Sequence, residues 1–194
     1  MKFFFWTVLA FAFVSNTLYA QNNALGIKNS IVFSLPQEPE SSTHLGFGTS
    51  LTYRRALSEK VGLSIEPGFL NTGVNFIYNI SGEQINDGYT FRYLEMPVLF
   101  SYLLASESHF FDFHTGFSPM LLLRAHYERL DVDVSQQVKR HTLNYLIGAS
   151  FKYKQERVDW GLTARYGWNL NRTYQEMDYR INLLVFSASV AFWL

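Results

Sequence analysis

The sequence contains no cysteine, and this absence excludes several kinds of chemistry at once. Disulfide scaffolds, thiolate metal sites and thiol nucleophiles are ruled out, so metal ligands could come only from carboxylates and five scattered histidines. An excess of charge of one sign is also lacking, because 16 Lys and Arg balance 16 Asp and Glu. With no basic field to neutralise phosphates, nucleic acid is not expected as a partner.

Long hydrophobic runs are missing as well. The apolar run from Phe3 to Val14 is too short for a membrane-spanning helix, which needs about 20 residues. Because it follows Lys2 and leads into the polar stretch Ser15 to Ala20, it has the layout of a secretory signal peptide, with cleavage expected after Ala20. We therefore predict a signal peptide at residues 1–20 and a single mature domain at residues 21–194.

Aromatic residues are abundant, with 18 Phe, 12 Tyr and 4 Trp, and they alternate with small or polar residues. From Leu45 to Arg54, large side chains occupy odd positions and small or polar ones occupy even positions, which is the two-residue period of a β-strand. A less regular strand is expected at about 25–35. Six further segments alternate in the same way: 61–69, 94–102, 111–118, 143–153, 158–169 and 184–194.

The polar face of these strands favours the interior of a membrane barrel over the surface of a soluble sandwich. It is rich in Gly, Ser and isolated charges of both signs, whereas a water-facing sheet would carry Lys, Glu and Thr. In a transmembrane barrel the apolar face meets lipid, and closure satisfies every backbone donor and acceptor. The predicted fold is all-β, an eight-stranded antiparallel up-and-down transmembrane β-barrel. A soluble all-β protein that is exported is the alternative.

Connection lengths give the expected orientation. Short turns at 56–60, 104–108 and 154–157 alternate with longer polar segments at 36–43, 79–88, 128–139 and 171–179. Outer-membrane barrels have short periplasmic turns and long extracellular loops, so the predicted location is the outer membrane. Aromatic girdles are expected at both interfaces. The periplasmic one would include Tyr53, Tyr102 and Tyr153, and the outer one Tyr78, Tyr89, Tyr127, Trp168, Tyr174 and Tyr179.

Two segments carry a resemblance to a known family. Tyr93 to Tyr102, with the sequence YLEMPVLFSY, resembles the "YLE-apolar-P" strand of the PorT-like outer-membrane β-barrel family of Gram-negative bacteria, and Ala164 to Gly167 resembles the family's "ARY" strand. The end of the chain is similar to the signal by which barrels are recognised for insertion, although Leu194 stands where an aromatic residue is usual. The resemblance implies an eight-stranded barrel, mostly without an assigned activity. The member that names the family implies an accessory role in type IX protein secretion.

The inward-facing positions supply the candidate site. Charged groups inside a narrow barrel pair with one another, so we predict a structural polar network in which Arg165 bridges Glu66 and Glu95. An acid–base site at Asp112 and His114 is the enzymatic alternative, because general-base catalysis uses a histidine oriented by a carboxylate. No nucleophile, metal-ligand or calcium-loop motif accompanies them, so no catalytic residue, metal or cofactor is predicted. The predicted network comprises Glu66, Glu95, Asp112, His114, Lys152, Asp159 and Arg165.

Three prolines break the local rule for strands. Pro67, Pro97 and Pro119 fall inside alternating segments, and each removes a hydrogen bond from the sheet. We predict a β-bulge at each of them.

These features together predict a small outer-membrane barrel without enzymatic activity. Its role would be structural or binding, through the extracellular loops or the periplasmic rim. The expected partners are outer-membrane lipid and lipopolysaccharide, with another envelope protein as a further candidate. The alternatives are a lipid-modifying outer-membrane enzyme, an accessory barrel of type IX secretion and a small porin.

Overall fold

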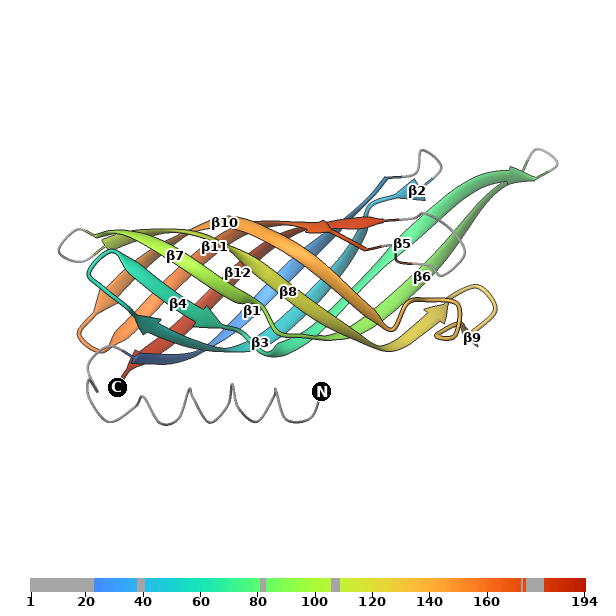
Figure 1. Cartoon of the computed structure of the whole chain (residues 1–194). Coiled ribbons are helices and arrows are strands. Elements are labelled where there is room, and N and C mark those ends of the chain that lie inside the picture. The colour runs from blue at the N-terminus through green and yellow to red at the C-terminus, as the bar shows by residue number, and fades with distance from the viewer. Residues whose placement is uncertain (1–22, 38–40, 81–82, 106–108, 172, 174–179) are drawn as a thin grey trace, which may run out of the picture.

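The computed structural model describes residues 23–37, 41–80, 83–105, 109–171, 173 and 180–194 (Figure 1). The predicted signal peptide lies outside these residues. No helix in the described ranges is long and apolar enough to cross a membrane.

Antiparallel strands form a closed barrel. β1 pairs with β12 on one side and with β3 on the other, and β8 pairs with β10, so the sheet returns to its starting strand. Closure leaves no free edge along the wall of the barrel, as a chain in lipid requires. The strands are β1 (Asn23–Pro36), β2 (Ser41–Ser42), β3 (His44–Ala56), β4 (Val61–Ile65), β5 (Gly68–Ile80), β6 (Glu83–Glu95), β7 (Val98–Ala105), β8 (His109–Tyr127), β9 (Val132–Asp133), β10 (His141–Gln155), β11 (Val158–Asn169) and β12 (Ile181–Trp193).

The number of strands differs from the predicted eight, because the described chain forms twelve. β2 and β9 are two-residue strands that pair with the outer parts of β5 and β8. β4 and β5 make one crossing that is interrupted after Ile65, and β6 and β7 make another that is interrupted after Glu95. With each interrupted crossing taken as one, the ring has the eight crossings that the alternation predicts.

The prediction of a bulge at each proline is wrong. Pro67 and Pro97 lie at the same height on neighbouring strands, where the Glu66 amide donates a 2.9 Å hydrogen bond to the Pro97 carbonyl. The register is unchanged across them, and Pro119 pairs in an unbroken part of β8. Proline has no backbone N–H to donate. Because Pro67 and Pro97 are neighbours, both missing hydrogen bonds fall within the same interruption of the sheet. The register shift lies elsewhere, between Arg92 and Tyr93 of β6.

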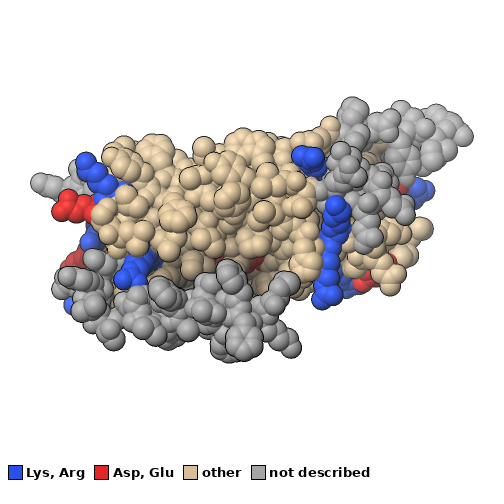
Figure 2. All heavy atoms as spheres, viewed as in Figure 1, with Lys and Arg blue, Asp and Glu red and all other residues tan. Residues whose placement is uncertain are grey.

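Burial follows the predicted alternation and is the inverse of that in a soluble protein. On β3, Leu45, Phe47 and Leu51 are more than 60% exposed, whereas Arg54 is buried. Figure 2 shows basic and acidic side chains gathered toward the two ends of the molecule, with uncharged surface between them. The exposed apolar belt is therefore the surface that meets lipid.

The lumen has two parts. Its half near the short turns is polar, whereas an apolar cluster fills the half near the long connections. Val134 and Val138, from the predicted 128–139 loop, fold back onto this cluster, which the sequence did not indicate. The cluster comprises Val32, Leu70, Val74, Phe91, Tyr93, Met120, Leu122, Ala125, Val134, Val138, Ile181 and Leu183.

One predicted loop is largely a hairpin. β5 continues to Ile80 and β6 begins at Glu83, so most of the 79–88 segment is paired strand. The hairpin extends beyond the rest of the barrel (Figure 1). The paired strands β5 and β6 thus form a projection at the end of the barrel with the long connections.

The aromatic girdles are described in part. Tyr102 and Tyr153 are 46% and 40% exposed near the short turns. At the other end Tyr89 stacks on Tyr127, and Trp168 is exposed and stacks on Tyr145. Tyr174 and Tyr179 lie outside the described residues, as does the side chain of Tyr78.

Candidate functional site: a luminal ion-pair network

Glu66 is the centre of the luminal network. It lies in the interruption between β4 and β5. Its side chain is buried inside the barrel, like those of the other even-numbered residues of this segment. Lys28 of β1 binds Oε1 at 2.6 Å, and Nη1 of Arg165 on β11 binds Oε2 at 3.0 Å. Both carboxylate oxygens therefore have a cationic partner, which offsets much of the cost of burying the charge.

His114 links this centre to a second carboxylate. Nε of Arg165 donates to Nε2 of His114 at 3.3 Å, and Nδ1 of His114 lies 3.3 Å from Oδ1 of Asp112. Because Nε2 accepts, the imidazole is neutral and carries its proton on Nδ1, which donates to Asp112. Lys152 of β10 binds the other oxygen of Asp112 at 2.5 Å. A continuous chain of contacts thus runs from β1 to β10.

A separate pair closes the end near the short turns. Arg54 of β3 donates through Nη2 to Asp159 of β11, and both side chains are buried. The Arg54 guanidinium lies 4.9 Å from the ring centre of Trp193 and 5.6 Å from that of Phe110. Cation–π contacts with both rings hold it across the barrel.

Glu95 is set apart from the other charges. Its closest polar contact is a long hydrogen bond of 3.5 Å from the hydroxyl of Ser118. In the described residues it makes no ion pair within 4.0 Å, so the prediction that Arg165 bridges Glu66 and Glu95 is wrong for Glu95. Arg165 instead contacts Glu66 and His114.

Comparison with known proteins agrees with this architecture. The family described as "outer membrane protein beta-barrel domain" matches residues 12–180. The chain belongs to this family. No curated protein matches the chain.

Two solved structures show the same barrel fold. Neisserial surface protein A is similar over 89% of this chain and 97% of its own, with 11% identity and a TM-score of 0.56. Ail of Yersinia pestis, in complex with the heparin analogue sucrose octasulfate, is similar over 88% of this chain and 98% of its own, with 12% identity and a TM-score of 0.51. Family and fold together place the protein in the outer membrane.

The sequence interpretation of this outer-membrane barrel missed two members of the network. Lys28 and Arg54 each pair with a predicted residue, Glu66 and Asp159 respectively. A signal was present, since both occupy the inward parity of their strands. Lys28 lies on the least regular strand, and Arg54 is two residues from the end of β3.

With these two residues the charges in the part of the described lumen around Glu66 balance. Four cations, Lys28, Arg54, Lys152 and Arg165, face the four carboxylates Glu66, Glu95, Asp112 and Asp159 in the described lumen. A cavity of about 40 Å³ lies among these charges other than Glu95, which lines a second cavity of about 20 Å³, so the space holds only a few water molecules. No group of three or more His, Asp or Glu in the described residues could hold a metal ion.

Proposed function

We propose that the protein is a sealed, non-enzymatic barrel that binds a macromolecular partner outside the cell. The projecting hairpin of β5 and β6, supported by the outer part of β8, is the observation that carries this proposal (Figure 1). β8 has 19 residues, whereas a transmembrane strand needs about 9–11. About half of β8 therefore serves a purpose other than crossing the membrane.

Ring contacts and hydrogen bonds connect the strands at the base of the projection. The rings of Phe76, Tyr89 and Tyr127 form a continuous row, with centroids 5.7 Å and 4.8 Å apart. Tyr127 donates a 2.7 Å hydrogen bond to the buried carboxylate of Asp87, and Thr90 donates one of 2.5 Å to Glu128. A preorganised surface loses little conformational entropy on binding, which favours a recognition role.

The lumen supports the other half of the proposal. A cavity of about 40 Å³ is far smaller than the 300–1,000 Å³ of typical ligand pockets, which argues against a substrate site at Asp112 and His114. Both ring nitrogens of His114 are engaged, so no lone pair is free to act as a base. The same filling argues against a porin.

The structural neighbours are compatible with surface binding. Ail is described as an attachment invasion locus protein and has been solved with a heparin analogue, so a barrel of this fold can bind an external ligand. Membership of the PorT-like branch, with its implied role in type IX secretion, rests on the segments Tyr93–Tyr102 and Ala164–Gly167 and stays a prediction.

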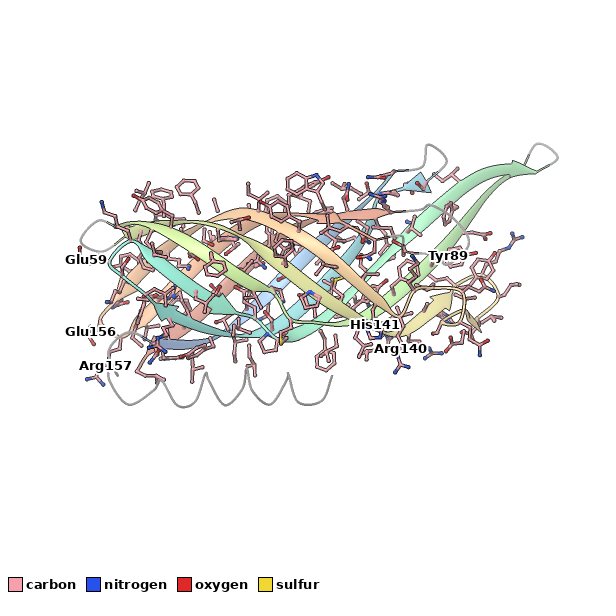
Figure 3. All side chains as sticks on the ribbon, viewed as in Figure 1. Glu59, Tyr89, Arg140, His141, Glu156 and Arg157 are labelled. Atoms are coloured by element: carbon pink, nitrogen blue, oxygen red, sulfur yellow. The ribbon has the colours of Figure 1, made fainter. Side chains whose placement is uncertain are left out.

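Photo-crosslinking in intact cells tests the proposal. A photo-reactive residue replaces Ile77, which is 38% exposed on the hairpin, and a control chain carries it in place of Glu59 in a short turn. Glu59 lies at the opposite end of the barrel from Tyr89 (Figure 3). We expect a discrete adduct from position 77 and none of the same mass from position 59. Adducts from position 59 alone, or from neither position, would contradict binding through the hairpin.

A further inference from the structure

Two arginines face each other on the outside of the barrel. Arg92 of β6 and Arg124 of β8 are direct cross-strand partners, and both are exposed. Like charges in directly opposed positions destabilise a sheet. An anion placed between the two guanidinium groups would relieve this repulsion.

A β-bulge creates the arrangement. Arg92 pairs with Arg124 but Tyr93 pairs with Leu122, so Leu123 is an extra residue in β8. Leu122 and Ala125 are buried, whereas Leu123 and Arg124 between them are both exposed. In regular alternation Arg124 would point into the lumen. The bulge turns it outward beside Arg92, and such re-aiming of side chains is a recurrent use of bulges.

The pair lies at the edge of the lipid-facing belt. Leu94 follows Arg92 along the outward face of β6, Met96 lies just beyond the end of that strand, and Leu123 precedes Arg124 on β8. All three are exposed apolar residues. Arg140 comes from the neighbouring strand region, where its carbonyl accepts a hydrogen bond from the Leu122 amide. Basic side chains form a band across this end of the uncharged belt (Figure 2), and Arg140 lies at the end with the long connections (Figure 3).

A groove of about 220 Å³ runs between the arginines, lined by Thr90, Arg92, Arg124, His126 and Asp131. The carboxylates beside it contact Arg124 and His126 and not Arg92. Nε of Arg124 is 3.8 Å from Asp133, and Nε2 of His126 is 3.0 Å from Asp131, whose side chain is 93% exposed. Among the described residues Arg92 has no ion pair within 4.0 Å.

We propose that this groove binds a phosphate group of an anionic glycolipid in the outer leaflet. Two guanidinium groups match the planar, bidentate geometry that phosphate recognition uses. The apolar side chains of Leu94 and Leu123, on the membrane side of the arginines, would contact the acyl chains of the same lipid. A soluble phosphate ester would leave this apolar part of the surface unused.

Lipid retention tests the proposal without reference to the hairpin. The full-length barrel is placed in phosphatidylcholine nanodiscs that contain bis-phosphorylated lipid A, and bound lipid is counted by native mass spectrometry. Arg92→Gln and Arg124→Gln should each reduce retention by about tenfold, because each removes a charge-assisted hydrogen-bonding group. Arg157→Gln, at an exposed arginine of a short turn, is the matched control and should retain lipid as the wild type does.

Two further arms identify the chemistry. Lipid A without phosphates should not be retained, and inorganic phosphate at millimolar concentration should not displace the lipid. Equal retention of the dephosphorylated lipid, or wild-type retention by the double variant, would overturn the phosphate site. Displacement by inorganic phosphate would overturn the assignment to a lipid.

Discussion

At the scale of single residues, the lumen is organised around side chains that serve more than one partner. Glu66 accepts from Lys28 and Arg165, and Arg165 also donates to His114. Removing one member of such a set leaves another charge buried without its partner, which costs more than an exposed ion pair contributes. Stability should therefore depend strongly on the members that have two partners.

Arg165→Ala is expected to destabilise the barrel by about 3–5 kcal/mol, because it leaves Glu66 with Lys28 alone. Glu95→Gln should change stability little, since Glu95 has only the long contact with Ser118 and an amide can keep it. Urea unfolding midpoints of the two variants, with Arg157→Ala as an exposed control, provide the measurement. An Arg165→Ala barrel as stable as the wild type would refute the network.

Asp133 gives a pH dependence outside the membrane. Hydrogen bonds from Ser135, including one of 2.8 Å from its amide, hold the pKa of the Asp133 carboxyl below its ordinary value of 3.8. A lowered pKa in the folded chain stabilises the local structure above the ordinary value and loses this effect as the pH falls through the folded value. Proteolysis between residues 128 and 140 should therefore become faster below about pH 4, the ordinary pKa range of Asp. In Asp133→Asn this acceleration should be absent, and an identical pH profile would contradict the assignment.

At the scale of strands, the two-residue alternation predicts most of the fold because the apolar face must meet lipid. It predicts positions 45–54 and 143–153 well, since every residue there is constrained by one face or the other. The alternation does not predict the continuation of β5 and β6 beyond the membrane, where neither face is constrained by lipid. It also misses the bulge at Leu123, since two adjacent outward residues break the period without any glycine or proline.

The site was predictable to a similar degree. The odd–even alternation predicts which side chains face the lumen, but it does not predict where each one lies along the barrel axis. The residues that it correctly places inside the barrel are Glu66, Asp112, His114, Lys152, Asp159 and Arg165. Pairing depends on height and register, and both follow from hydrogen bonding between distant strands. For this reason Arg165 has His114 as its second partner, and Glu95 has only the long hydrogen bond from Ser118.

The bulge itself yields a prediction at this scale. Deleting Leu123 removes the extra residue and leaves Arg92 opposite Arg124 and Tyr93 opposite Leu122 in a regular ladder. We expect this variant to insert and to keep the heat-modifiable mobility of a folded barrel on gels. Deleting Ile147 from the unbulged β10 should prevent folding, because it moves every following side chain of that strand to the opposite face. Equal behaviour of the two deletions would show that the bulge does not absorb the length change.

At the scale of the whole molecule, the barrel is closed by two layers of different chemistry. The ion-paired layer occupies the half near the short turns, and the apolar cluster around Phe91, Leu70 and Met120 occupies the other half. An eight-crossing barrel encloses an interior just wide enough for side chains. We therefore expect either layer alone to block the passage of ions.

This double closure predicts the electrical behaviour of the protein. In planar bilayers the wild type should give no stable single-channel steps. The double variant Glu66→Ala and Arg165→Ala should also give none, because it leaves untouched the apolar layer in which Phe91 and Leu70 are buried. Mass spectra of lipid A from cells with and without the protein should be identical, since the cavity beside Asp112 and His114 is too small for a lipid substrate. Steps from the double variant alone would show that the ion-paired layer is the only seal, whereas steps from the wild type would establish the porin alternative.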